Sequence, residues 1–379
     1  MRLKSLPRGV KAAYRLINHP NPHPDALDRK TDAEIEALIE TLYEKKEDAI
    51  AGAYDPDFVP AVGQVMLVGY DGEWREKYRY WDPLHPLHVL SYQLHAIGVG
   101  GQLSAIYFPH SGDVRDRLAL TDLLADLIHE ALRRGVILEY PKHVIFVGFF
   151  LRVDLALLSD FVHFREQLGN VGGKIATTRR PVSMGLVCDR RELERIDNDR
   201  NLYLDNGEQF VKVPITFYDI ARHAAEKTPL SELGKVIHLP KKTIKAPFHI
   251  GRMDEYRRKK LKNFILYGIR DAQIPANYYA HVLKFARKQV GGPRIAQGFL
   301  PTAAGGLAVQ MLRKKLKEAG LDYEQVFGIK YKTQQPFDEQ AHRYRFKRRK
   351  TKNPYRQIRE TFAVMCYHGG RNEPKNLSW

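Results

Sequence analysis

A tyrosine and an aspartate stand four residues apart in the segment Tyr267-Gly-Ile-Arg-Asp271. The surrounding residues 261–288 carry apolar side chains at helical spacing, so we predict a helix there. Residues four apart lie on the same face of a helix, so the carboxylate and the phenol would project together. Such a pair can hold a metal ion and orient a water molecule beside it. Because the pair is common in helices, it indicates a site only if further carboxylates join it.

Three further acids precede this pair, each next to a predicted strand. Asp71 and Glu73 end a strand predicted over 65–74, and side chains two apart on a strand share a face. Asp154 follows residues 143–150, a short apolar run that is typical of a buried central strand. Each acid alone would equally suit a solvated strand end or the first turn of a helix.

Together the acids and the tyrosine form an ordered set: an acid pair, a single acid, and then Tyr-x-x-x-Asp. Clustered carboxylates repel one another when they are buried, and they bind hard divalent cations such as Mg²⁺ or Mn²⁺. Two such ions, about 3.5–4 Å apart, activate water and stabilise the leaving oxygen in phosphodiester cleavage. The set therefore predicts a metal-dependent nuclease.

The elements that must position these residues alternate between strands and helices. Three strands, a helix, the buried strand and another helix are predicted in that order, at 65–74, 89–97, 102–108, 121–134, 143–150 and 153–164. The motif Gly98-Val-Gly-Gly101 predicts a hairpin between the second and third strands. This order predicts an α/β protein with a mixed sheet of the ribonuclease H type, flanked by helices.

A β-rich insertion is predicted next, with strand pairs over 174–187 and 201–215 and a turn at Asp205-Asn-Gly207. Short elements over 215–225 and 230–237 follow, then the segment 253–287, which holds the long helix, and a basic helix over 308–318. We therefore divide the chain into an N-terminal helical appendage (1–55), a nuclease domain (56–290) and a basic C-terminal region (291–379).

The 379-residue chain carries a formal net charge of +17, and such a surface attracts polyanions, of which nucleic acid is the most frequent. Membrane surfaces and acidic proteins compete for such a surface, and net charge does not choose among them. The two cysteines, Cys188 and Cys366, have no CxxC spacing, which fits a reducing compartment. Without a secretory leader or a long apolar run, we expect a cytoplasmic protein, associated with a nucleoid or a mobile element.

The positive charge is densest over residues 343–359, where aromatic side chains are interleaved with basic ones. Basic and aromatic residues together suit a phosphate backbone whose bases stack. A solvated loop is the alternative for a charge run. Four basic residues of this stretch are our candidates for nucleic-acid binding: Arg345, Lys347, Arg348 and Arg349.

Over residues 62–288 the chain resembles the DEDD-type 3′–5′ exonucleases, specifically the tyrosine subclass in the proofreading domain of family B DNA polymerases, including the protein-primed polymerases of plasmids and phages. Asp71 and Glu73 resemble the first motif of that family, Phe150-Leu-Arg-Val-Asp154 the second and Tyr267-Gly-Ile-Arg-Asp271 the third. The histidine subclass carries its histidine where this chain has Leu266. The resemblance implies that Asp71, Glu73, Asp154 and Asp271 bind two Mg²⁺ or Mn²⁺ ions, and that Tyr267 positions the attacking water.

Two positions depart from the family pattern. Phe150 stands where the second motif usually carries an asparagine that helps to hold the single-stranded end, and Trp74 replaces a small hydroxyl residue. We take Phe150 and Arg152 as candidates for contacts with the DNA strand. Lys235 and Lys241 are candidate helpers that match no family position securely.

Tyr367-His-Gly-Gly370 resembles the Tyr-x-Gly-Gly element that links the exonuclease and polymerase domains in this family and contacts the template strand. Tyr367, Gly369 and Gly370 are therefore candidates for nucleic-acid binding, because glycines let backbone amides approach phosphate closely. A plain Gly-Gly turn is the alternative.

We expect a 3′–5′ exonuclease that hydrolyses single-stranded DNA 3′ ends to nucleoside 5′-monophosphates. No Tyr-x-Asp-Thr-Asp segment is present for a polymerase palm, so the chain alone is not expected to polymerise. It would be part of a longer polymerase, a subunit that binds a separate polymerase subunit, or a stand-alone derivative. Two other functions remain open: a weakly active or inactive DNA-binding accessory module, and a ribonuclease or defence nuclease on the same fold.

Overall fold

The computed structural model describes residues 65–75, 87–110, 114–168, 177–178, 180–203, 209–225, 227–321 and 326, together with short strands between 329 and 350. The chain divides into two compact units, Met1–Thr302 and Ala303–Trp379. The predicted N-terminal appendage and the segment Tyr367–Gly370 lie outside the described residues.

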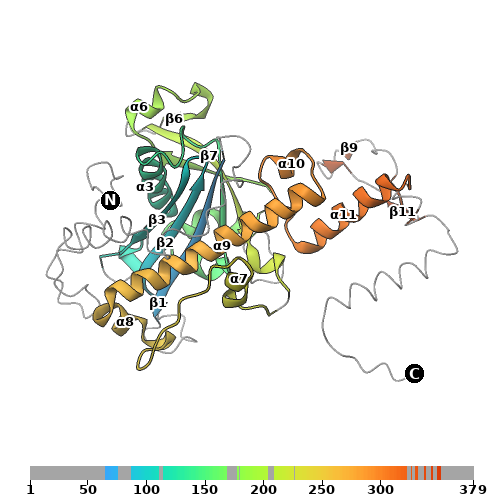
Figure 1. Cartoon of the computed structure of the whole chain (residues 1–379). Helices are drawn as coiled ribbons and strands as arrows, with labels where there is room; N and C mark the ends of the chain where they lie inside the picture. The colour runs from blue at the N-terminus through green and yellow to red at the C-terminus, as the bar shows by residue number, and fades with distance from the viewer. Residues whose placement is uncertain are drawn as a thin grey trace, which may run out of the picture. The chain divides into compact units, whose positions relative to one another are not determined.

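A mixed sheet forms the centre of the first unit (Figure 1). Strands β1 (Val65–Arg75), β2 (His88–Gly98) and β3 (Gly101–Tyr107) run antiparallel in a meander, and the predicted hairpin places Gly98 opposite Gly101. Strand β1 then pairs in parallel with β4 (His143–Gly148), and β4 pairs in parallel with β7 (Gln209–Asp219). The order β3-β2-β1-β4-β7 is the ribonuclease H arrangement, so the predicted fold class is confirmed.

The position of β7 corrects the prediction of an insertion over 201–215. Residues 209–219 form a core strand instead, because Val211, Val213, Ile215 and Phe217 are all fully buried. Among the residues described here, β5 (Val182–Val187) and β6 (Asn201–Tyr203) extend the sheet, and both pair with β7 in antiparallel fashion. The predicted turn residues 205–207 and the first part of the predicted strand pair, 174–176, lie outside the described residues.

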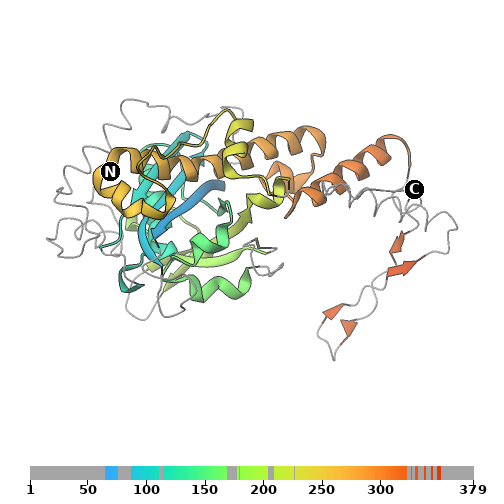
Figure 2. The ribbon, with the colours of Figure 1, turned by 90° about the horizontal axis from the view of Figure 1, so that it is seen from below.

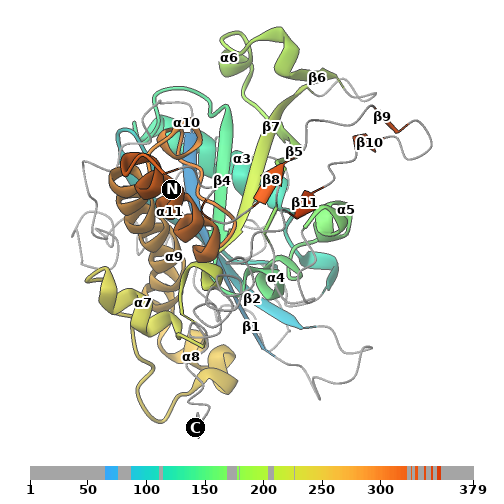
Figure 3. The same ribbon diagram turned by 90° about the vertical axis from the view of Figure 1, so that its right-hand side faces the viewer.

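Two helices cover opposite faces of the sheet, α3 (Leu120–Arg133) on one side and α9 (Leu261–Gln289) on the other (Figures 1 and 3). Figure 2, which views the molecule from below, also shows α9 running along the sheet. Side chains alternate along β1, so Met66, Val68 and Tyr70 join the core that contains the leucines of α3. The residues between them, and with them Asp71 and Glu73, face α9.

Gly69 sets how closely α9 approaches β1. A Cβ atom at this position would overlap the carbonyl oxygen of Ala272 and lie 2.9 Å from the Cβ of Ala276. Only glycine therefore permits this packing distance. The close approach brings the middle of α9, where Asp271 lies, against the part of β1 that carries the predicted acids.

The predicted helix over 153–164 is wrong as a single element. Helix α4 spans only Leu151–Leu155, and α5 begins at Phe161 and ends at Phe164. Between them, the Asp160 carboxylate accepts hydrogen bonds from the backbone amides of Leu120 (2.9 Å) and Thr121 (3.2 Å). Asp160 thus satisfies amides at the start of α3, which requires a turn rather than a helix at this point.

The helix predicted over 261–288 is confirmed as α9 (Leu261–Gln289), and the first residues of the segment 253–287 form a separate helix, α8 (Met253–Lys259), with non-helical backbone at Lys260 between them. The change of direction lets the apolar faces of both helices reach one core, in which the rings of Tyr256 and Phe264 meet edge to face. The predicted apolar stripe of α9 is buried as expected, at Phe264, Tyr267, Ile274, Tyr278 and Leu283.

The first unit also contains short helices: α6 (Arg190–Leu193), α7 (Leu230–Val236), α10 (Pro293–Ala296) and 3₁₀ turns at Val114–Asp116, Arg165–Gln167, Asn198–Arg200, Ile220–His223 and Ile250–Arg252. In the second unit, α11 (Ala304–Glu318) confirms the predicted basic helix. Two short ladders follow, β8 (Ile329–Tyr331) with β11 (Arg348–Lys350) and β9 (Phe337–Asp338) with β10 (Arg343–Tyr344). Among the helices described, none combines the length and the apolar character that a membrane crossing requires.

Candidate active site

The carboxyl ends of the parallel strands β1, β4 and β7 meet at one edge of the sheet, the usual place for ligands in parallel α/β sheets. Asp71 and Glu73 lie near the end of β1, where the pairing register shifts after Glu73. Phe150 follows β4, and Asp219 is the last residue of β7. Polar groups from segments far apart in sequence therefore gather at this edge.

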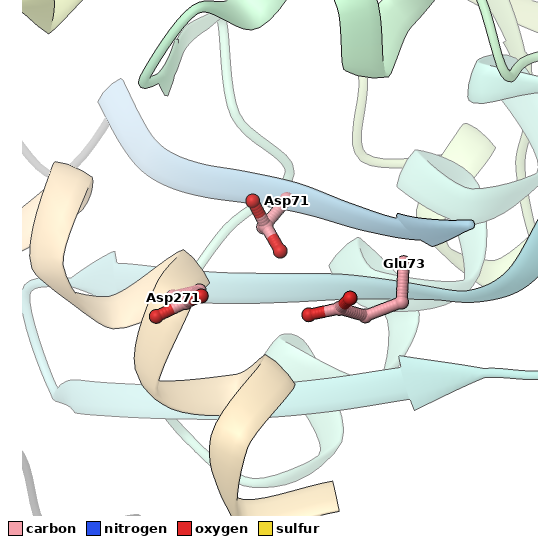
Figure 4. Close-up of side chains that lie close together, drawn as sticks. All are labelled: Asp71, Glu73 and Asp271. Carbon is pink, nitrogen blue, oxygen red and sulfur yellow. The ribbon is translucent and has the colours of Figure 1, made fainter. Parts of the chain in front are cut away.

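Three carboxylates come together here. Asp71, Glu73 and Asp271 each offer an oxygen atom, and these atoms all lie within 4.8 Å of one another. Asp71 and Glu73 extend from the same side of β1, and Asp271 comes from a turn of α9 beside them (Figure 4). The spacing of two residues on a strand and the close packing at Gly69 together produce this group.

The fourth predicted ligand, Asp154, lines the same pocket but is not a member of the group of three. It lies in the first turn of α4 and is 7% exposed. The backbone amide of Gly72, between the two acids of β1, donates a hydrogen bond to its carboxylate. Asp154 is thereby held against the acid pair through the backbone of β1.

The acids stand at the base of an open pocket of about 770 Å³. Its walls come from the end of β1, the segment after β4, the start of α8 and one face of α9. The lining residues other than the acids are Gly72, Trp74, Arg75, Phe149, Phe150, Val153, Ile250, Gly251, Met253 and Tyr267. The pocket opens to solvent, and its volume is in the usual range of small-molecule sites.

Burial raises the pKa of every acid in the pocket, and the charges of neighbouring acids add to this shift for Asp71, Glu73 and Asp154. Burial, then the charge of Asp271, raises the pKa of Asp71 to about 7, although Lys241 opposes the shift. Burial, then Asp71 and Asp271, raises the pKa of Glu73, and burial, then Asp71 and Glu73, raises that of Asp154. At neutral pH the negative charges of the cluster are therefore not balanced by the neighbouring cations, and a bound metal ion would stabilise them.

Tyr267 and Lys241 complete the surroundings of Asp271. The Nζ atom of Lys241 lies 2.5 Å from Oδ2 of Asp271 and 5.0 Å from the ring centroid of Tyr267. Burial lowers the pKa of Lys241, but the charges of Asp271, Asp71 and Glu73 outweigh it and raise the pKa overall. Burial, then the neighbouring carboxylates, raises the pKa of Tyr267. At neutral pH the lysine is therefore cationic and the phenol retains its proton.

One further observation indicates that the cluster suits a divalent cation. Oδ1 of Asp271 is buried and has no hydrogen-bond partner among the described residues, whereas Oδ2 is paired with Lys241. A buried carboxylate oxygen without a partner is costly, and a cation would satisfy it. The donor set consists of oxygen atoms only, as Mg²⁺ and Mn²⁺ prefer.

Phe150 and Arg152 lie where the second motif meets the pocket. Phe150 is exposed and lines the pocket, and Arg152 is half-buried in α4 and does not line it. Lys235, a candidate helper, pairs with Glu232 at 2.7 Å on α7 and lies outside the pocket lining. Lys241, the other candidate, is the lysine that contacts the cluster.

The remaining candidates are not placed by the structure. Arg345, Lys347, Tyr367, Gly369 and Gly370 lie outside the described residues. Arg348 and Arg349 belong to β11, of which only the backbone is described. Their roles in nucleic-acid binding stay predictions.

Sequence reasoning missed Asp219. Its Oδ1 accepts hydrogen bonds at 3.1 Å from the backbone amides of Phe150 and Ala221, and the residue is fully buried. Burial raises its pKa to about 6 although these amides lower it, and its charge contributes to the raised pKa of Asp154. An acid near the end of an apolar run is the available signal, but the predicted insertion over 201–215 assigns this run to no core strand.

Two DNA polymerases are among the known proteins to which this chain is similar. No protein-family model matches the chain. A DNA polymerase of Escherichia coli, described as primer-independent DNA polymerase PolB, is 27% identical over 310 residues, which are 81% of this chain. Among solved structures, phi29 DNA polymerase in a ternary complex with primer-template DNA and incoming nucleotides matches 73% of this chain and 40% of that chain, with 11% identity and a TM-score of 0.32.

The match to the E. coli polymerase spans about a third of that protein's length, 34%. It covers most of the present chain. The chain therefore contains a domain related to the family B DNA polymerases.

Proposed function

We propose that this chain is a metal-dependent 3′–5′ exonuclease of the proofreading type, acting on single-stranded DNA ends either within a family B polymerase or as a derivative of one. The observation that carries the proposal is the group of Asp71, Glu73 and Asp271, whose oxygen atoms lie within 4.8 Å of one another in an open pocket. The relative is named as a DNA polymerase, and the formal net charge of +17 suits a polyanionic substrate.

Asp71, Glu73 and Asp271 would hold the divalent ions, with Asp154 completing the set from α4. When bound, two such ions supply an activated water and stabilise the leaving oxygen of a phosphodiester. The unpartnered Oδ1 of Asp271 and the mutual repulsion of the acids support this role.

Tyr267 and Lys241 lie beside the carboxylate of Asp271 and would assist the reaction there. The phenol of Tyr267 keeps its proton, so it is able to donate a hydrogen bond and orient a water molecule at the edge of the cluster. Lys241 holds Asp271 in one rotamer through its 2.5 Å contact and adds positive charge beside the place where a phosphate would sit. Arg152 is proposed to contact the incoming strand.

The test is degradation of single-stranded DNA by the full chain with Mg²⁺ or Mn²⁺. One oligonucleotide carries a label at its 3′ end and a second carries it at its 5′ end. We expect immediate release of labelled mononucleotide from the first and a descending ladder from the second. Asp271→Asn and Asp71→Ala should lose this activity.

Glu130→Gln serves as the matched control, because Glu130 is a buried acid that pairs with Arg133 and Arg134 away from the pocket. Equal degradation by wild type and Asp271→Asn, or no metal-dependent degradation by wild type, would rule out the proposal. Binding of DNA without turnover would instead support the accessory-module alternative. A parallel RNA oligonucleotide distinguishes the ribonuclease alternative, since recognition of the 2′-OH separates the two substrates.

A further inference from the structure

The pocket has an apolar rim above its acidic base. Three large apolar side chains of the pocket lining are exposed: Phe150 (53%), Val153 (45%) and Ile250 (71%). Exposed apolar side chains that share one concave site indicate a ligand with an apolar face. Phosphate has no such face, and a nucleobase offers a larger and flatter one than the furanose ring.

Phe150 has a backbone conformation that opposes its residue type. Its φ of 54° and ψ of 38° place it in the left-handed region. Bulky residues rarely adopt this region, and such outliers gather at functional sites, where the surrounding structure enforces them. Within the described residues, only Lys227 and His238 share this feature among non-glycine residues, and neither lines the pocket.

Asp219 contacts the backbone at this position. Its buried Oδ1 accepts the Phe150 amide at 3.1 Å and ties the residue to the end of β7. The Phe150 ring also packs against Phe149, with centroids 4.6 Å apart and planes at 70°. This edge-to-face contact covers only part of the Phe150 ring, because Phe150 remains more than half exposed.

We propose that Phe150 is a stacking platform for a nucleobase near the end of a single-stranded nucleic acid, and that Asp219 positions it. This inference deepens the proposed function, on which it rests for the identity of the strand. Stacking on an aromatic ring is tolerant of sequence, because every base has a π face. The platform would place the terminal phosphodiester over the carboxylates at the base of the same pocket.

Equilibrium binding to two fluorescent single-stranded oligonucleotides tests the platform in the full chain. One has normal 3′-terminal nucleotides, and in the other the last two bases are replaced by abasic tetrahydrofuran residues. Binding is measured in EDTA, so that no cleavage occurs. The variants are Phe150→Asn, which removes the ring, and Phe150→Tyr, which keeps it. Phe285→Asn is the control, because Phe285 is 45% exposed on α9 but does not line the pocket.

We expect Phe150→Asn to weaken binding of the base-bearing oligonucleotide by roughly 5- to 150-fold, the usual range for one stacked base. The abasic oligonucleotide should lose less than about twofold, since its end has nothing to stack. Phe150→Tyr should bind like wild type, and Phe285→Asn should change neither affinity. Because asparagine tolerates the left-handed region, Phe150→Asn should also keep or raise the melting temperature, which separates lost binding from lost folding.

Asp219→Ala tests the positioning role. It should weaken binding of the base-bearing oligonucleotide only, and it should add nothing when combined with Phe150→Asn. Equal losses on both oligonucleotides, no loss in Phe150→Asn, or no wild-type binding would overturn the inference. The proposed cleavage activity is judged separately in Mg²⁺, so base-dependent binding without cleavage would refute the exonuclease and leave the platform standing.

Discussion

Asp71→Asn should stabilise the metal-free protein. The substitution keeps the size and shape of the side chain and removes one negative charge from the group it forms with Glu73 and Asp271. In addition, the asparagine NH₂ is able to donate a hydrogen bond to either neighbouring carboxylate. A residue proposed to bind metal is thus expected to cost stability when no metal is present.

The magnitude follows from the pKa of Asp71, which burial and Asp271 raise from 3.8 to about 7. The folded state therefore binds the proton more tightly than the unfolded state. The resulting penalty is absent below the unfolded pKa, grows as pH rises toward 7, and is fully present above it. A shift of this size corresponds to about 4 kcal/mol, from about 1.36 kcal/mol per pKa unit. Because one side of Asp71 is open to the pocket, solvent screening brings the expected gain to about 2–4 kcal/mol.

Thermal and urea unfolding in EDTA at pH 8 provide the assay, with a repeat near pH 5.5, where the gain should be smaller. A gain of this size raises the melting temperature by roughly 4–16 °C, at about 2–4 °C per kcal/mol for a domain of this size. Adding Mg²⁺ or Mn²⁺ should stabilise the wild type more than Asp71→Asn, because binding to the folded state alone shifts the equilibrium.

Glu130→Gln is the control with the opposite sign. Burial alone would raise the pKa of Glu130, but hydrogen bonds from Arg133 and Arg134 outweigh it and lower the pKa. Glu130→Gln should therefore lower the free energy of unfolding by about 1–3 kcal/mol at any metal concentration. Lower stability of Asp71→Asn than of wild type in EDTA at pH 8, or equal stabilisation of both by Mg²⁺, would refute the reasoning.

Three further predictions follow from the described residues. Gly69→Ala should push α9 away from β1, lower unfolding free energy by more than about 2 kcal/mol and abolish stabilisation by Mg²⁺; an unchanged metal response would contradict the role of Gly69. Tyr267→Phe should slow DNA cleavage by about 10²–10⁴-fold in single-turnover assays while Mg²⁺ still raises the melting temperature; full activity would remove Tyr267 from the proposed mechanism. Burial lowers the pKa of His95 from 6.5 to about 4, so stability should fall by about 3 kcal/mol as pH drops from 7 through this range. Urea unfolding of His95→Gln at both ends of the range should show a flatter pH dependence, and an equal slope would locate the effect elsewhere.

Much of the fold could be predicted because it depends on local patterns. Alternating and continuous apolar runs identified β1 to β4, and the glycines of residues 98–101 identified the hairpin. The errors lie where a distant partner decides the outcome. Asp160 turns the chain to cap α3, and burial on both faces places β7 in the core sheet.

The candidate site divides in the same way. Strand spacing placed Asp71 and Glu73 on one face, and helix spacing placed Tyr267 and Asp271 on another, from sequence alone. Lys241 was only a candidate without a secure position, and Asp219 was missed. Both reach the site from loops or strand ends whose place depends on the packed sheet.

The order of the acids, the strand-then-helix pattern and the basic character of the chain were determined by the sequence, since each follows from residue types and spacing without any knowledge of which residues are in contact. The tertiary structure decided that Asp271 lies beside Asp71, because Gly69 lets α9 approach β1. It also decided that Asp219 at the end of β7 accepts a hydrogen bond from the amide of Phe150, whose exposed side chain lines the pocket. Contacts between residues so far apart in sequence depend on how the sheet and helices pack, and local periodicity does not predict this packing.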